Sequence, residues 1–267
     1  MSKDWKGKKL YHYTGYSALE GIINSEELWL CNVKAMNDKT EMLHYMNTIK
    51  TAVYSGLNKN QSRKATALFN EQIIRLKDKP VYAMSFSFLR DDAAQWERYS
   101  ANGMGVCIQF NAEILEKVCS NHAMLTDVFY TQGAAQKSEH AKLIRDYIIT
   151  SSVDMQAWGD INGIFDNCWA ASSAYKHKSF KTEKEVRIVS LPFALKTFLD
   201  DPHYQMESWG IREYYKIKIS EKIEDLISEI IIGPRANVTV DTLQRYLQHL
   251  SNDYTKITVK ESECPLR

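Results

Sequence analysis

This 267-residue sequence lacks several features that mark secreted, membrane-spanning and modular proteins. Its five cysteines are an odd, scattered set with no CxxC pair and no zinc-ligand spacing, which argues against a disulfide framework and a metal site. No stretch approaches the roughly eighteen continuous apolar residues of a membrane helix, and the first residues lack the apolar run of a signal peptide. Five prolines and no glycine- and serine-rich linker leave no clear domain boundary. We therefore expect one cytoplasmic domain over residues 1–267, with a core at about 8–260, reduced thiols and no metal.

Motifs of several enzyme classes are missing as well. The sequence has no Gly-x-Ser-x-Gly nucleophile elbow, no His-Glu-x-x-His metal helix and no Walker loop. Gly103 and Gly105 precede an expected strand, but a dinucleotide fingerprint needs further glycines and a following helix. The net charge of +1 argues against a large non-specific nucleic-acid surface, although it is compatible with a local basic patch. The composition, 44% apolar and 25% charged, is that of a globular protein that can bury a substantial core.

Hydrophobic patterning predicts interleaved strands and helices, but the strands are more numerous than a series of βαβ units would contain. We therefore expect an α+β fold with a central mixed or antiparallel sheet flanked by helices. The expected strands are 9–14, 28–31, 81–88, 106–110, 128–131, 183–191, 214–219, 230–232 and 256–259, and the expected helices are 17–24, 38–54, 62–77, 111–118, much of 134–177 and 240–250. Ser17 with Glu20, and Asp38 with Glu41, have the spacing of capping boxes. The helical insertion at about 38–78 either covers the sheet or forms a mobile lid.

The first expected strand carries one histidine, His12, between two tyrosines. Side chains alternate along a strand, so His12 shares a face with Leu10 and Thr14, while Tyr11 and Tyr13 lie on the other face. An imidazole at a strand end, just before a turn, is well placed to bind a ligand. The alternative is a structural histidine whose hydrogen bonds are satisfied within the fold.

Two further expected strands carry polar residues that can meet His12. On 81–88 the small side chains, Ser85 and Ser87 among them, share one face, which leaves room either for a ligand or for a closely packed helix. On 183–191 the residues Glu183, Glu185 and Arg187 share a face. The alternative for Glu185 and Arg187 is a surface ion pair.

A carboxylate beside an imidazole and hydroxyls can stabilise a cationic transition state or accept a proton. Cleavage of an N-glycosidic bond needs such a carboxylate, because the sugar carbon develops oxocarbenium character. Trp96 and Tyr99 offer aromatic rings for stacking on a base. Lys176, Lys178 and Lys181 either receive a pyrophosphate or form a solvated loop.

Several blocks resemble a bacterial domain-of-unknown-function family, number 2971. The blocks are Leu10–Thr14, Leu28–Leu30 with Met36-Asn37-Asp38 and Glu41, Ser85-Phe86-Ser87 with Trp96, Tyr99, Gly103 and Gly105-Val106, Lys178-Ser179-Phe180 with Glu183, Glu185-Val186-Arg187, and Ile231–Pro234. They span about residues 9–235 in the expected order. This resemblance implies no particular reaction.

Tyr-His-x-Thr on a first strand followed by a helix is also similar to the opening of diphtheria-toxin-like ADP-ribosyltransferases, which have a split sheet and use NAD. That resemblance implies that His12 binds the NAD ribose and that Glu185, or alternatively Glu183, supports glycosidic cleavage. The middle tyrosine of that group would be Tyr82 or Tyr99. The implied NAD-binding set is His12, Tyr13, Thr14, Ser85, Ser87, Trp96, Tyr99, Lys178 and Arg187.

The leading hypothesis is therefore an ADP-ribosyltransferase or NAD glycohydrolase, as in a bacterial toxin or phage-defence effector, with an unknown protein or nucleic-acid acceptor. One alternative is a non-catalytic nucleotide or nucleic-acid binding module, and another is a structural partner of a protein from the same operon. The enzyme hypothesis requires that His12, Ser85 and Glu185 line one pocket.

Overall fold

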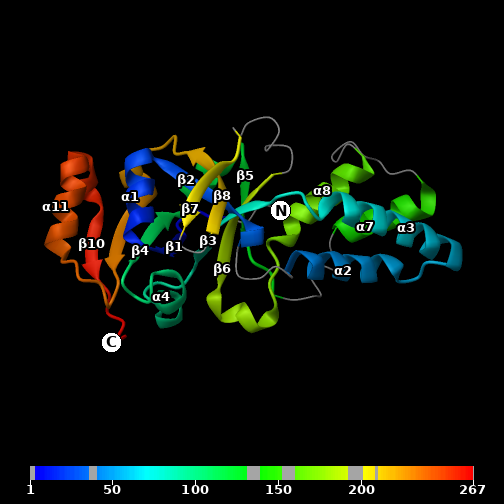
Figure 1. Cartoon of the computed structure of the whole chain (residues 1–267), viewed down its shortest axis with the longest axis horizontal. Helices are drawn as coiled ribbons and strands as arrows, with labels where there is room; N and C mark the ends of the chain where they lie inside the picture. Colours follow the sequence, from blue (N-terminus) through cyan, green and yellow to red (C-terminus); the bar gives the residue numbers. More distant parts are fainter. Residues whose placement is uncertain are drawn as a thin grey trace.

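The structure is a computed structural model that describes residues 4–35, 41–130, 139–151, 160–191, 201–207 and 210–266. Within these ranges the chain forms a ten-stranded mixed sheet with helices around it, which confirms the predicted α+β class (Figure 1). The strands are β1 (Lys9–Thr14), β2 (Glu27–Asn32), β3 (Tyr82–Ser87), β4 (Val106–Asn111), β5 (Ala123–Asp127), β6 (Glu185–Ser190), β7 (His203–Glu207), β8 (Gly210–Lys218), β9 (Ile227–Ile232) and β10 (Thr258–Glu261).

The helices precede, connect and follow these strands. The α-helices are α1 (Tyr16–Ser25), α2 (Glu41–Tyr54), α3 (Lys59–Leu76), α4 (Ala93–Tyr99), α5 (Ala112–Cys119), α7 (Glu139–Thr150), α8 (Ile161–Ser172), α10 (Ile223–Leu226) and α11 (Val240–Leu250), and the 3-10 helices are η1 (Val33–Ala35), η2 (Lys178–Glu183) and η3 (Asn252–Lys256). No helix in the described part of the chain is long and apolar enough to cross a membrane.

The sheet is split at β3. One edge of β3 pairs with β6 along its length, from Ala83 to Ser87. Its other edge is shared: β2 pairs with the start of β3, opposite Tyr82 and Ala83, and β1 pairs with its end, where Tyr11 lies opposite Ser87. From there β1 continues into β4, β9 and β10, whereas β2 continues into β8 and β7. The two halves therefore diverge beside the middle of β3, and α1 connects them directly.

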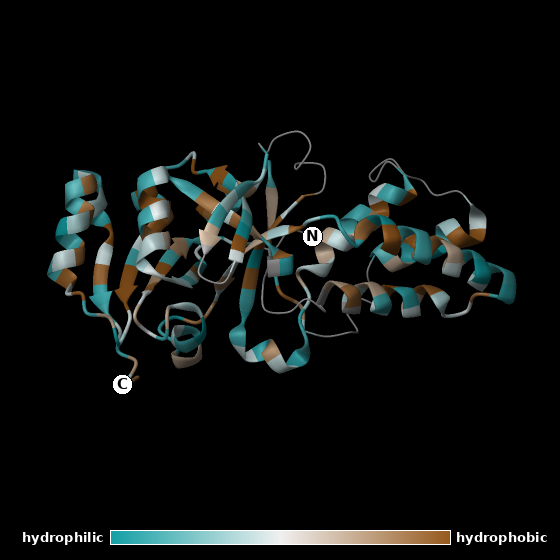
Figure 2. Ribbon diagram, in the orientation of Figure 1, coloured by the Kyte–Doolittle hydropathy of each residue, from teal (hydrophilic) through white to brown (hydrophobic). Residues whose placement is uncertain are grey.

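Two large hydrophobic clusters support this arrangement. One fills the space between the sheet and helices α1, α5, α10 and α11. The other lies in the helical lobe, which consists of α2, α3, α7 and α8 and extends from the β6 end of the sheet (Figure 1). In Figure 2 hydrophobic residues recur along the strands and within this lobe. Helices α2 and α3 pack mainly on α7 and α8, so the segment expected to cover the sheet or act as a lid forms a bundle with them.

Several expectations about local structure need correction. Helix α1 begins at Tyr16 with Gly15 as its N-cap and no side-chain cap, so Ser17 and Glu20 do not form a capping box. The strand expected at 128–131 lies earlier, at β5, because residues 128–130 contain only an isolated bridge at Phe129. Strand β7 was missed altogether. The capping box at Asp38 lies outside the described residues.

Candidate active site

A cavity of about 680 Å3 opens where the sheet splits. This volume is within the range of small-molecule sites in proteins. Its walls come from β1, β2, β3, β6, β8, α1, α4 and the segment that links α8 to β6. The cavity thus occupies the one place where β1 and β2 both leave β3, so its position follows from the sheet topology.

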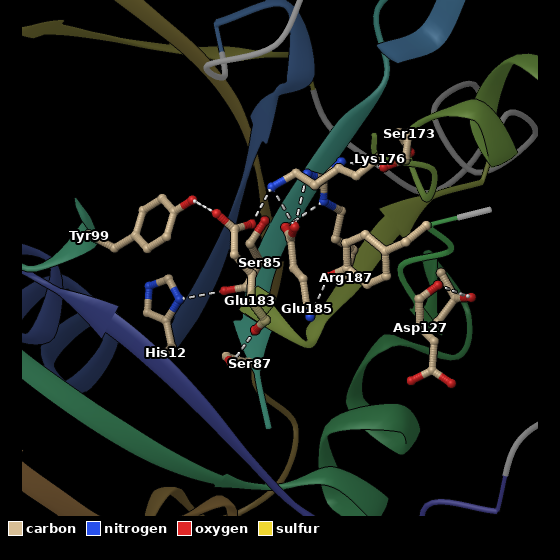
Figure 3. Close-up of polar contacts among 12 residues, drawn as sticks. His12, Ser85, Ser87, Tyr99, Asp127, Ser173, Lys176, Glu183, Glu185 and Arg187 are labelled. Atoms are coloured by element: carbon tan, nitrogen blue, oxygen red, sulfur yellow. Dashed lines mark hydrogen bonds and ion pairs between the residues drawn. The ribbon is translucent and has the colours of Figure 1, made fainter. Parts of the chain in front are cut away.

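His12 lines the cavity from β1, the strand that leaves β3 after Tyr11. Its Nδ1 lies 2.8 Å from the carbonyl oxygen of Ser85 on β3 (Figure 3). A carbonyl oxygen only accepts, so Nδ1 carries the proton and Nε2 is left as an acceptor. Burial lowers the pKa of His12, and the hydrogen bond to Ser85 only partly offsets this shift. The ring is therefore a neutral imidazole with a fixed tautomer near neutral pH.

Glu183 and Glu185 lie together on the opposite wall, and Lys176 bridges them. Lys176 Nζ lies 2.9 Å from Glu183 Oε2 and 2.6 Å from Glu185 Oε2 (Figure 3). Arg187 approaches the same carboxylate, with Nε 2.6 Å from Glu185 Oε1 and a second nitrogen 3.3 Å from Oε2. Both glutamates and Arg187 are buried. Glu185 and Arg187 are thus part of a buried network, and the alternative of a surface ion pair is wrong.

Glu183 is tied further to helix α4. Its Oε1 accepts hydrogen bonds from the Arg98 guanidinium at 2.9 Å and from the Tyr99 hydroxyl at 3.0 Å. Glu183 is the last residue of η2 rather than part of the strand, which begins at Glu185. Lys184, between them, has a positive φ of 44°. Although the strand begins only after this turn, Glu183 and Glu185 both line the cavity. We call Arg98, Lys176, Glu183, Glu185 and Arg187 the ionic wall.

The charges of the ionic wall stabilise one another. Burial alone raises the pKa of Glu185, but the neighbouring Arg187 and Lys176 charges outweigh it, so that the pKa lies below its ordinary value. Burial likewise lowers the pKa of Lys176, but the Glu185 charge and the hydrogen bonds to Glu185 and Glu183 together raise it more, and the net shift is upward. The glutamate is an ionised carboxylate and the lysine a cation at neutral pH.

The structure brings most of the expected site residues to this one cavity. His12, Tyr13, Thr14, Ser85, Tyr99, Glu183, Glu185 and Arg187 all line it. His12, Ser85 and Glu185 therefore meet the condition set by the enzyme hypothesis, while their roles stay predictions. Of the three lysines, only Lys176 lines the cavity.

Three expected ligand-binding residues lie elsewhere. The hydroxyl of Ser87 is buried and donates to the carbonyl of Glu183 at 2.7 Å, so it fixes the chain rather than a ligand. Trp96 is fully buried behind β1, with its Nε1 donating to Asp91, and cannot stack on a base. Lys178 is exposed on η2, outside the cavity lining, as is expected of a solvated loop lysine. Tyr82, one candidate for the middle tyrosine, also lies outside the lining, whereas Tyr99 is part of it.

Sequence reasoning missed several lining residues, namely Trp29, Gln95, Arg98, Phe180 and Arg212. Arg98 is adjacent to Tyr99 and Phe180 is adjacent to Lys181, and both neighbours are candidate site residues. This adjacency is the signal in the sequence that could have found them. Trp29 stands in the Leu-Trp-Leu block and is the only aromatic residue of β2. Arg212 has no such signal, because β8 was expected to begin two residues later, at Tyr214.

Cations outnumber carboxylates in the cavity lining. Arg98, Lys176, Arg187 and Arg212 face two carboxylates, Glu183 and Glu185. The lining also holds aromatic side chains from several elements, namely Tyr11, Tyr13, Trp29, Phe86, Tyr99 and Phe180. Excess positive charge with aromatic surface suits an anionic ligand that carries a planar ring.

Comparison with known proteins finds a match to a family model. Residues 95–188 match the model of a protein family of unknown function, DUF2971. No curated protein and no solved structure is significantly similar to the chain. The matched span runs from α4 into β6 and contains the entire ionic wall, whereas His12 and Ser85 precede it. The resemblance to the DUF2971 family that the sequence predicted is therefore found over residues 95–188.

Proposed function

We propose that the protein binds NAD in the cavity and cleaves its nicotinamide–ribose bond, transferring ADP-ribose to an acceptor or to water. The observation that carries the proposal is that His12, Ser85 and Glu185, chosen from separate stretches of sequence, line one cavity at the split of the sheet. The split itself is the feature expected of an ADP-ribosyltransferase-like sheet.

The proposed reaction divides the work between the two sides of the cavity. The bond between the nicotinamide nitrogen and C1′ of the ribose breaks, and nicotinamide leaves with the electron pair. C1′ gains positive character and bonds to an acceptor oxygen or nitrogen, whose proton is released to the solvent. Glu185, which is ionised, supports the positive charge. The unprotonated Nε2 of His12 accepts a hydrogen bond from a ribose hydroxyl.

In this proposal Lys176 and Arg187 act through their contacts with Glu185. Lys176 and Arg187 hold the carboxylate in a single orientation but also reduce its negative potential. A carboxylate has about four lone-pair positions, so Glu185 can still accept a ribose hydroxyl while these contacts persist. Lys176 and Arg187 are therefore positioning residues, and Glu185 is the catalytic residue.

The test follows nicotinamide release from NAD by chromatography, with NAD binding measured by calorimetry on the same preparations. Glu185→Gln should retain NAD binding within about fivefold and lose at least about a hundredfold in release rate, the scale of losing one electrostatic stabiliser. Asp166→Asn, which removes a carboxylate from the helical lobe, is the matched control and should change neither quantity. Absence of both NAD binding and release in the wild type would refute the proposal.

A second candidate function is a non-catalytic nucleotide-binding module. The observation that favours it is the paired state of both glutamates, each of which contacts two cations. Wild-type protein that binds NAD without releasing nicotinamide, and a Glu185→Gln variant that binds equally well, would select this function. Its affinity should fall with salt concentration, because the ligand is held by its charge.

A further inference from the structure

One face of helix α4 lines the cavity. Gln95, Arg98 and Tyr99 all belong to the lining, and their spacing of three and four residues places them on one side of the helix. Arg98 and Tyr99 donate hydrogen bonds to Glu183, and Figure 3 shows the Tyr99 hydroxyl directed at that carboxylate. Two of the three side chains on this face therefore contact Glu183, and Gln95 is the third.

The side-chain amide of Gln95 is buried and unpaired. The backbone N–H of Gln95 donates to the Asp92 carboxylate at 3.1 Å, but the side-chain amide has no hydrogen-bond partner among the described residues. Gln95 is only 5% exposed, yet its amide is not among the fully enclosed unpaired polar groups of the described chain. The small accessible surface that remains therefore faces the cavity that Gln95 lines.

Gln72, the other buried glutamine of the described residues, shows the usual arrangement. It lies on α3 and is 1% exposed. Its amide nitrogen donates to Asn162 at 2.9 Å, and its amide oxygen accepts from Arg75 at 2.7 Å. Buried polar groups are nearly always paired in this way, because an unpaired one costs free energy. The unpaired amide of Gln95 therefore indicates a hydrogen-bond partner that enters through the cavity.

The chemistry of an amide limits what that partner can be. A primary amide offers donors on its nitrogen and lone pairs on its oxygen. A ligand group that satisfies both ends must itself carry a donor next to an acceptor. The carboxamide of nicotinamide is such a group. Adenine also has a donor next to an acceptor, but in NAD it is separated from the reacting C1′ by two phosphates and a second ribose.

The position of Gln95 favours the carboxamide. Gln95 lies one helical turn, about 5.4 Å along the axis, before Tyr99. Tyr99 contacts Glu183, which Lys176 links to Glu185. In the proposed reaction C1′ lies at Glu185, and the nicotinamide ring is bonded to C1′. A carboxamide on that ring is therefore expected beside the α4 face, whereas adenine is remote from it.

We propose that Gln95 is a specificity-determining residue that binds the carboxamide of the nicotinamide ring. Its side-chain oxygen accepts from the carboxamide N–H, and its nitrogen donates to the carboxamide oxygen. This inference rests on the proposed function, because that function places nicotinamide in the cavity. Gln95 then holds the leaving group while Glu185 supports the charge on the ribose, so binding of the ring and cleavage of its bond depend on different residues.

The experiment compares NAD with its 3-acetylpyridine analogue, in which a methyl group replaces the carboxamide NH2 and the charge is unchanged. Calorimetry of the wild type should show at least about fivefold tighter binding of NAD, the scale of one lost hydrogen bond that leaves a buried partner unpaired. Gln95→Met removes the amide at similar side-chain length and should reduce this preference to within about twofold. The affinity for ADP-ribose, which lacks the carboxamide, should change less than about twofold in the same variant.

Gln72→Met is the matched control, because it removes a buried glutamine amide that is paired. It should leave the preference for NAD unchanged. Thermal unfolding without ligand gives a second measurement: Gln72→Met breaks two hydrogen bonds and should lower the melting temperature, whereas Gln95→Met breaks none and should not. A decrease in Gln95→Met equal to that in Gln72→Met would give Gln95 a structural role and overturn the inference.

The remaining outcomes separate this inference from the proposed function. A wild type that releases nicotinamide but binds both dinucleotides equally would overturn the inference and keep the function, as would a preference that Gln95→Met leaves unchanged. Loss of ADP-ribose affinity in Gln95→Met would overturn the inference and place adenine at Gln95. A preference that Gln95→Met abolishes, in a protein that releases no nicotinamide, would keep the carboxamide site and refute the function. Failure of the wild type to bind NAD would overturn both.

Discussion

Two ionic clusters in this protein have similar geometry and different surroundings. In the ionic wall, Lys176 and Arg187 contact Glu185 at 2.6 Å each, and all three side chains are at most 12% exposed. In the helical lobe, Arg75 and Lys79 contact Asp166 at 2.7 and 3.0 Å, with side-chain exposures between 23% and 40%. Each cluster places two cations on one carboxylate.

The difference between them is the cost of removing the charges from water. Partly exposed ion pairs keep much of their hydration and contribute little to stability. Buried ion pairs lose that hydration, and apolar residues of similar size often serve stability as well or better. Compared with apolar residues of similar size, the buried ionic wall is therefore expected to add little to the free energy of unfolding. Its place beside a cavity of about 680 Å3 supports the proposed role in binding or catalysis.

The largest expected effect is on stability when one carboxylate is neutralised in each cluster. Glu185→Gln leaves Arg187 and Lys176 buried with one carboxylate fewer, and should lower the free energy of unfolding by about 3 kcal/mol or more. Asp166→Asn should lower it by no more than about 1 kcal/mol. Urea titrations of both variants beside the wild type measure this. Equal losses would show that the two clusters are energetically alike.

The next effect is a pH dependence confined to the ionic wall. The pKa of Glu185 is lower in the folded protein than its ordinary value of 4.5, so its contribution to stability is complete above that value and is lost as the pH falls through the folded pKa. The difference in unfolding free energy between wild type and Glu185→Gln should therefore shrink below pH 4.5. Urea titrations from pH 7 to pH 3 test this, and a difference that stays constant would contradict the assigned direction.

The smallest expected effect comes from single hydroxyl groups. Tyr99 donates to the buried Glu183 at 3.0 Å, whereas the Tyr54 hydroxyl meets Thr66 at 2.7 Å on an exposed part of the helical lobe. Tyr99→Phe should destabilise the protein by about 1 kcal/mol, and Tyr54→Phe by less than about 0.5 kcal/mol. Thermal unfolding of the pair of variants measures the contrast. A larger loss for Tyr54→Phe would reverse the comparison.

The sequence predicted the position of the site better than its burial. Period-two alternation placed Glu185 and Arg187 on one face, and the structure agrees. The burial of these residues depends on Lys176, which lies in the segment between α8 and β6, and on β5, which pairs along the outer edge of β6 and makes it an interior strand. Such contacts join segments far apart in the chain, and no local pattern reports them.

The errors in the predicted site also come from contacts between segments far apart in the chain. Trp96 and Tyr99 lie three residues apart on a short helix, and composition cannot tell which of them faces the core. The structure buries Trp96 against Tyr13, at 4.9 Å between ring centroids, and turns Tyr99 to Glu183. Arg212 was missed because the start of β8 lies beyond the buried part of its pattern, where alternation is weakest.

The split at β3 also has a mechanical consequence. Strands β1 and β2 share one edge of β3 and diverge beside Met84, Ser85 and Phe86, so the sheet's two halves are joined there by few backbone hydrogen bonds. A ligand that contacts both halves links them while it is bound. At a concentration a hundred times its dissociation constant, it adds about 2.7 kcal/mol to the free energy of unfolding. Amide hydrogens at the diverging ends of β1 and β2 should then exchange more slowly with solvent in the bound protein. Slower exchange of these amide hydrogens would therefore report that the cavity is occupied.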